Sequence, residues 1–272
     1  MATRVIDDTK LQNIAVAIQG KDSGGTMTVD EMPTRIAAIQ TGDEVLFSSD
    51  GRQYTRTVEI PNNVTTIGDY AFKGCEHLQT VVIPNSVTSI GEFSFDGDSS
   101  LHSINLNGIT SCGQYAFRGC IGLENIVAQS LNIIPIGMFG LSSGLISLDI
   151  RNASNVNNYA FNRCTSLKYL DIRNATQIGT VILNANTSME IIDLTSCTTP
   201  PTLDHDAFYS VTANWKAVFK DSATKSAVQS ATNWSNHASH IYTVAEIESI
   251  YGASYGELYQ LWFGHPRNEV VL

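Results

Sequence analysis

Apolar residues recur through the middle of the chain with a period of 22 or 23 residues. An apolar-x-apolar triplet begins at positions 58, 81, 104, 126, 148, 170 and 192. An aromatic column keeps the same phase, at Phe72, Phe95, Phe117, Phe139 and Phe161. Such a triplet is typical of a short strand with one buried face. One repeat cannot bury its apolar face alone, so the pattern predicts a solenoid in which successive strands pair in parallel.

The repeat also carries a specific motif. Its fixed positions in the first coil are an isoleucine, an Ala-Phe pair, a cysteine and a leucine: Ile67, Ala71, Phe72, Cys75 and Leu78. With the Ile-Pro pair at 83–84, they resemble the BspA-like leucine-rich repeat over about residues 58–208. The resemblance implies an α/β repeat fold, a right-handed leucine-rich-repeat solenoid of about 7 coils. It also implies adhesion and protein binding rather than catalysis.

The two ends of the chain depart from the repeat. Apolar residues at helical spacing predict a helical hairpin over residues 1–42, and an Asp-Gly turn predicts a β-hairpin over 43–57. The repeats occupy residues 58–213, and residues 214–272 are expected to form an α/β cap with helices. Capping boxes at 243–246 and 254–257 each predict a short helix in that cap.

The N-terminal segment carries a second resemblance. Residues 11–15 and 32–37 are similar to a short module of minor structural (tail) proteins of bacteriophages and prophages, with Pro33 where that family usually has alanine. This resemblance implies a tail-associated protein that contacts a host surface or a virion subunit. A plain cap that shields the first coil is the other interpretation of this segment. A bacterial cell-surface BspA-like adhesin is the alternative function.

Composition narrows the class of partner. The chain has 16 basic and 26 acidic residues, a net charge of -10, so it lacks the basic footprint of a nucleic-acid binder. No apolar run approaches the ~20 residues that span a bilayer, and the first residues lack the apolar core of a signal peptide. We therefore expect no membrane insertion. We expect the protein to be associated with a virion or prophage, or to lie on the cell surface if a signal peptide was trimmed.

The sequence offers little catalytic chemistry. Three of the five cysteines, Cys75, Cys120 and Cys164, share a repeat column but lie two coils apart, too far for a disulfide. We expect all five to be free thiols. The cluster of residues 204–206, Asp-His-Asp, falls in the degenerate last coil. We expect no enzyme activity, no metal site and no cofactor.

The candidate binding face is formed by the strand residues that point away from the core. Two interpretations stay open: a self-neutralised surface, or a polar stripe that faces a ligand. Like charges stack between coils there, but a neighbouring arginine ladder offsets them. The candidate residues are Asn105, Val127, Asp149, Arg151, Asp171, Arg173 and Asp193.

The last predicted helix is unusually aromatic. Tyr255, Tyr259 and Trp262 would lie on it. Aromatic clusters mark interfaces, so the helix is either buried against the end of the solenoid or exposed as a docking helix for a partner subunit. The sequence indicates neither the ligand nor the oligomeric state.

Overall fold

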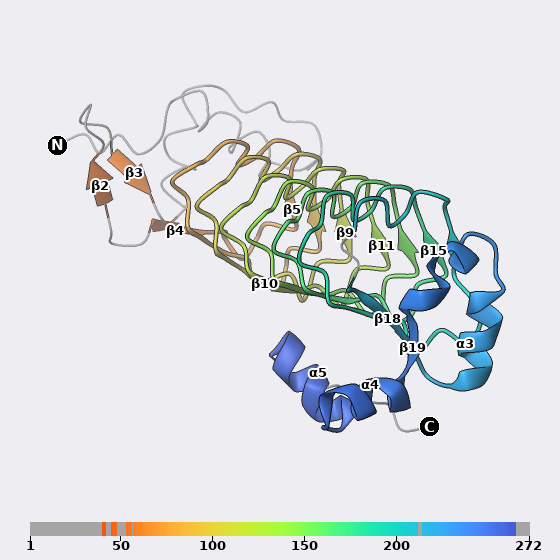
Figure 1. The fold of residues 1–272 in the computed structure, drawn as a ribbon. Coiled ribbons are helices and arrows are strands. Elements are labelled where there is room, and N and C mark those ends of the chain that lie inside the picture. Colours follow the sequence, from red (N-terminus) through yellow and green to blue (C-terminus); the bar gives the residue numbers. More distant parts are fainter. Residues whose placement is uncertain (1–39, 42–44, 48–52, 56, 212–213, 265–272) are drawn as a thin grey trace.

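The chain forms an elongated stack of coils, which the computed structural model describes at residues 40–41, 45–47, 53–55, 57–211 and 214–264 (Figure 1). Each coil contributes one strand to the strand face, the sheet column that contains the predicted triplets. Its strands are β4 (Thr57–Glu59), β6 (Thr80–Val82), β8 (Ser103–Ile104), β10 (Asn125–Val127), β12 (Ser147–Asp149), β14 (Tyr169–Asp171), β16 (Ile191–Asp193), β18 (Lys216–Phe219) and β19 (Ile241–Thr243).

The strand face consists of two sheets, with strand orders β1-β4-β6-β8 and β10-β12-β14-β16-β18-β19. Pairing is parallel throughout, except that β1 (Gln40–Thr41) pairs antiparallel with β4. Leu148 pairs with Leu170, and Leu170 pairs with Ile192, one repeat apart. The predicted parallel stacking of triplets is therefore confirmed.

A second column of short parallel strands runs along the same coils. It is divided into the sheets β5-β7-β9 and β11-β13-β15-β17. The bounds are β5 (Thr66–Ile67), β7 (Ser89–Ile90), β9 (Ser111–Cys112), β11 (Ile133–Ile134), β13 (Asn155–Val156), β15 (Gln177–Ile178) and β17 (Thr202–Leu203).

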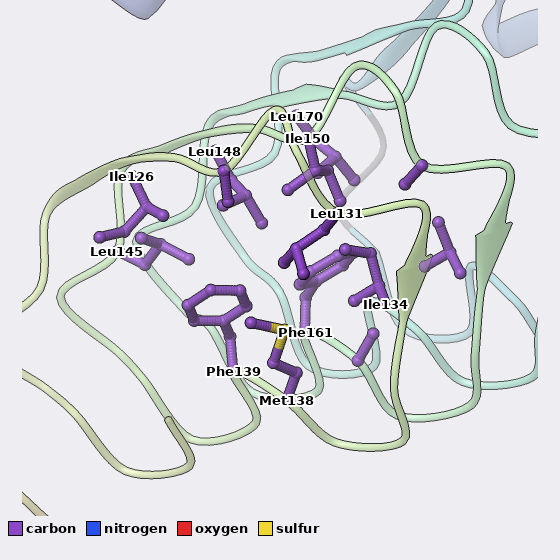
Figure 2. Packing of buried hydrophobic residues seen from close by; sticks show 14 of the residues in the cluster. Ile126, Leu131, Ile134, Met138, Phe139, Leu145, Leu148, Ile150, Phe161 and Leu170 are labelled. Atoms are coloured by element: carbon purple, nitrogen blue, oxygen red, sulfur yellow. The ribbon is translucent and has the colours of Figure 1, made fainter. Parts of the chain in front are cut away.

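The core between the two columns is a set of stacked apolar ladders (Figure 2). Phe72 and Phe95 stack with ring centroids 5.0 Å apart, and Phe117 lies 5.1 Å from Phe95. The ladder continues through Phe139 to Phe161, and all five rings are buried. Each ring therefore gains both area burial and an aromatic contact with the next coil.

The cysteine column has a structural role in this core. The thiols of Cys120 and Cys164 donate to the carbonyl oxygens of Phe95 and Phe139 in the preceding coil, each at 3.0 Å. Ser142 occupies the same column and donates to the Phe117 carbonyl at 2.8 Å. Burial raises the pKa of Cys164 to about 12, so its thiol stays protonated and unreactive. None of the five cysteines, all of which are among the described residues, forms a disulfide.

The solenoid is longer than the sequence pattern indicates, with about 8 turns instead of about 7. Ile191 of β16 pairs with Lys216 of β18, a step of 25 residues. The longer step takes β18 and β19 out of phase with the preceding repeats. Part of the predicted C-terminal cap therefore extends the sheet.

The helices follow β18. They are α3 (Ser222–Gln229), the 3-10 helix η1 (Trp234–His240), α4 (Val244–Tyr251) and α5 (Tyr255–Phe263). Thr243 and Ser254 form the predicted capping boxes, with Glu246 and Glu257 respectively. Trp234 is fully buried, and its ring packs against Phe208 and Phe219 at the end of the core.

At the other end, β2 (Val45–Phe47) and β3 (Gln53–Thr55) pair antiparallel, which is the hairpin that the Asp-Gly signal predicts. The phage-like module predicted for the N-terminal segment lies outside the described residues, as does the predicted helical hairpin except at Gln40–Thr41, which form strand β1 rather than the end of a helix.

Candidate binding face

The structure divides the candidate residues of the strand face into two groups. In the first group, Asn105 is exposed and Val127 is half-buried. The Val82 side chain, at the equivalent position of an earlier coil, is 47% exposed. Asp149, Asp171 and Asp193 are at most 1% exposed. Of the two interpretations of these candidates, the ligand-facing stripe is therefore wrong at these three carboxylates in this arrangement of the chain, because helix α5 packs on this part of the strand face.

Helix α5 packs on the strand face, and Figure 1 shows α4 and α5 alongside the sheet of β10 and β18. Tyr255, Tyr259 and Trp262 are at most 5% exposed. They form an apolar cluster with Ile191, Val218 and other residues of α5. The Trp262 ring stacks on Tyr169 of β14 with centroids 5.9 Å apart. The aromatic helix is thus buried, although on the strand face rather than at the end of the solenoid, and its aromatic side is not an exposed docking surface.

Each of the three carboxylates accepts a hydrogen bond from a backbone N–H at the point where its strand ends. Asp149 Oδ1 accepts the backbone N–H of Arg151 at 3.1 Å, and Asp171 Oδ1 accepts that of Arg173 at the same distance. Asp193 accepts the N–H of Thr195 at 2.9 Å. Asn105 makes the same bond to Asn107. An Asx turn of this kind satisfies a backbone donor as the chain leaves the sheet.

Two of these carboxylates also pair with the arginine two residues later. Arg151 Nη2 lies 2.5 Å from Asp149 Oδ2, and Arg173 Nη2 lies 2.6 Å from Asp171 Oδ2. In both pairs Nε also donates to the carboxylate. These bidentate, charge-assisted bonds are much stronger than neutral ones. The predicted neutralisation by the arginine ladder is therefore present, but it acts in a buried site.

Tyr259 connects the helix to this ion ladder. Its hydroxyl donates to Asp171 Oδ2 at 2.6 Å and accepts from Arg151 Nη2 at 2.9 Å. The Arg173 guanidinium lies 4.8 Å from the centroid of the Tyr259 ring. Desolvation and the neighbouring carboxylates raise the pKa of Tyr259, so the hydroxyl stays protonated and acts as a donor.

The charges of the ladder are not evenly matched. Arg173 Nη2 is 2.6 Å from Asp171 Oδ2 and 3.4 Å from Asp193 Oδ2, so two carboxylates share one guanidinium. Burial, and then the charge of Asp193, raise the pKa of Asp171 to about 6. At Asp149, desolvation is outweighed by the hydrogen bonds from Arg151 and Gln129, which lower the pKa of that carboxyl. The unmatched charge therefore lies at the Asp171–Asp193 pair.

The other chemical candidates do not form a site. His205 Nε2 lies 2.7 Å from Asp206 Oδ2, but both side chains are exposed. Asp96 is bound by Lys73 and Arg118. In the part of the chain that the structure describes, no three His, Cys, Asp or Glu side chains gather as metal ligands would. None of the described helices is long and apolar enough to cross a bilayer.

The Asx turns have a signal in the sequence that lies outside the apolar columns. Asn or Asp recurs as the middle residue of the triplet in coils that start at 104, 148, 170 and 192, two residues before the chain turns. The contact of Tyr259 with Asp149 and Asp171 has no such signal. These residues are 110 and 88 positions apart in sequence and belong to segments with different patterns.

The chain is similar to several solved leucine-rich repeat proteins. No curated protein matches the sequence. Among solved structures, a leucine-rich repeat protein from Bacteroides ovatus is 22% identical, with a TM-score of 0.46, over 74% of this chain and 58% of that one. The pneumococcal vaccine antigen PcpA is 17% identical, with a TM-score of 0.45, over 74% of this chain and 47% of that one. The chain thus spans about half the length of these two proteins.

A T. pallidum leucine-rich repeat protein is 18% identical with a TM-score of 0.39, over 63% of this chain and 96% of that one. The sequence profile of the BspA type leucine rich repeat region matches residues 47–168 and 132–257, in six copies. Because this match extends over most of the chain, the chain belongs to the BspA-type leucine-rich repeat family.

Proposed function

We propose that the protein is a non-catalytic interaction protein that binds a protein or a cell-surface ligand through the open part of its strand face. We define this open face as four outward side chains, one from each of four successive coils: Glu59 of β4, Val82 of β6, Asn105 directly after β8, and Val127 of β10. The observation that supports the proposal is the exposure of this face on a rigid repeat scaffold. Repeat solenoids use such extended surfaces for binding.

The chemistry of the open face suits a protein or glycan surface. Glu59, Val82 and Asn105 are exposed, and Val127 is half-buried. The face thus offers one acid, one amide and two small apolar side chains, spaced by the strand separation of about 4.8 Å. With a net charge of -10 for the whole chain, a polyanionic partner is disfavoured.

The experiment compares two substitutions of exposed aliphatic residues. Val82→Asp changes the open face, whereas Ile133→Asp changes β11 in the other sheet column, where the side chain is 51% exposed. Binding of the purified full chain to bacterial envelope fractions is measured for both. We expect Val82→Asp to weaken binding and Ile133→Asp to preserve it. Equal binding by the two variants would contradict the use of the open face.

For the biological setting we propose a phage or prophage tail-associated structural protein, with a bacterial cell-surface adhesin as the second candidate. The resemblance of residues 11–15 and 32–37 to tail proteins favours the first, and the family itself favours the second. Antibody detection in purified virions and in purified envelopes separates them. Presence in envelopes together with absence from virions would exclude the tail assignment.

A further inference from the structure

The surface beneath α5 has an unexpected composition for a permanent interface. Asp149, Arg151, Asp171, Arg173 and Asp193 are all buried there. Replacing buried ion pairs by apolar residues is often neutral or stabilising, because burial removes the hydration of both charges. If this part of the strand face only packed permanently against α5, the charged ladder would therefore add little to the stability of the protein. Charged residues that pair within one coil suit a face that is in contact with water for part of the time.

The packing allows α5 to leave without opening the solenoid core. Its buried residues, with Ile191 and Val218, form a cluster separate from the main core of stacked ladders. The Asp149–Arg151 and Asp171–Arg173 pairs lie within their own coils and do not depend on the helix. Gly252 and Ser254, in the segment that joins α4 to α5, are exposed. Detachment of α5 would therefore expose a paired, polar ladder together with a few apolar side chains.

The charges that face Asp171 decide how docking depends on pH. Asp149 and Asp193 stack on either side of it through the strand register. Its cations are Arg173 at 2.6 Å and Arg151 at 3.9 Å, and its contact from α5 is the Tyr259 hydroxyl. Three carboxylates and two guanidinium groups thus meet in this cluster of the described residues. Docking of α5 removes water from Asp171, which shares Arg173 with Asp193, and a proton would relieve that cost.

We propose that α5 is a proton-linked cover of the strand face, which docks with uptake of a proton at the Asp171–Asp193 pair and detaches more readily at neutral than at mildly acidic pH. The proposal rests on the proposed function in one respect: detachment would extend the open face by β12, β14 and β16. Detachment itself needs no partner, so it can be measured on the protein alone.

The direction follows from proton linkage. The pKa of Asp171 is raised to about 6 in the docked state, above the value near 3.8 of an unperturbed carboxyl. The docked state therefore binds more protons than the open state between these values, and docking weakens as the pH rises through about 6. For one proton, these two values give roughly tenfold tighter docking at pH 5.0 than at pH 7.5.

Amide hydrogen exchange tests both parts of the proposal. Opening constants of the amides at the C-terminal end of α5 are measured at pH 5.0 and 7.5, after correction for intrinsic exchange rates. Core amides such as those of Phe117 and Phe139, which bond to the next coil, are the internal reference. We expect α5 to open well before the core, and about tenfold more often at pH 7.5. Exchange of α5 only together with the core, or equal opening at both pH values, would overturn the proposal.

Two variants locate the proton. Asp193→Asn removes the surplus charge, while its side-chain oxygen can still accept from Thr195. We expect it to weaken the pH dependence well below tenfold and to raise the protection of α5 at pH 7.5 toward the acid value. Glu76→Gln, which removes an exposed carboxylate in the first coil, is the matched control and should behave as the parent. A tenfold pH effect that persists in Asp193→Asn would contradict the assignment. Because no ligand is present, these outcomes do not depend on the binding function.

Discussion

The two halves of the strand face are built from the same repeat but present opposite chemistry. In the coils of β4, β6 and β8 the outward residues are Glu59, Val82 and Asn105, and all three are exposed. On β12, β14 and β16 they are Asp149, Asp171 and Asp193, and all three are buried in the half of the face on which α5 packs. The more highly charged half is thus the covered one. Charge along a repeat therefore does not by itself identify the surface that meets a partner.

The difference depends on how each carboxylate is satisfied. In the covered half, Asp171 accepts hydrogen bonds from the backbone N–H of Arg173, from two N–H groups of the Arg173 guanidinium and from the Tyr259 hydroxyl. Buried charges persist in proteins when they are paired and fully hydrogen-bonded in this way. In the open half, Glu59 and Asn105 are in contact with water and need no such network. The pairing with arginine thus makes burial of the charged half possible, and the packing of α5 on this half produces that burial.

The largest expected effect comes from removing the shared cation. Arg173→Ala would leave Asp171 and Asp193 buried without their common guanidinium, and breaking a buried ion pair costs roughly 3–5 kcal/mol. We expect a loss of this size in the free energy of unfolding, measured by urea denaturation at pH 7.5.

Arg118→Ala is the matched control for this comparison. Arg118 also makes a bidentate bond to an aspartate, Asp96, but its side chain is 39% exposed. Exposed pairs contribute about 0–1 kcal/mol. Similar losses for the two variants would show that burial under α5 does not distinguish the two ion pairs.

A smaller effect is expected from the hydroxyl that joins α5 to the ladder. Tyr259→Phe keeps the ring and removes the donor to Asp171, and an unsatisfied buried partner costs about 1–3 kcal/mol. The expected result is a matching decrease in stability at pH 7.5. Tyr209→Phe, at a side chain that is 62% exposed, should leave the stability unchanged. A Tyr259→Phe variant as stable as the parent would mean that the hydroxyl bond adds nothing to docking.

The smallest expected effect on stability lies in the open half. Val82→Thr changes an exposed strand residue to one of similar shape and high strand propensity, so its effect should stay within about 0.5 kcal/mol. Urea denaturation checks this expectation. A loss of several kcal/mol would show that the open half, like the covered half, is buried in the folded protein.

The repeat and its boundaries follow from local patterns. The 22- to 23-residue period, the buried Phe column, the hairpin of β2 and β3 and both capping boxes depend on residues within one coil or one turn. The extension of the sheet through β18 and β19 was missed as a continuation of the repeat, because a step of 25 residues shifts its phase. The candidate face was identified because side chains alternate between the two faces of a strand, so the sequence indicates which residues point outward.

Burial of that face could not be predicted from the same patterns. The sequence by itself determined a solenoid of BspA-type repeats, its stacked core and an aromatic, well-capped final helix. Only the tertiary structure decided that Tyr259 lies over Asp171, 88 residues earlier, and that Trp262 lies on Tyr169. An amphipathic helix specifies that one side will be buried, but not against which surface. The choice between the end of the solenoid and its strand face depends on shape and charge that exist only once the coils have stacked.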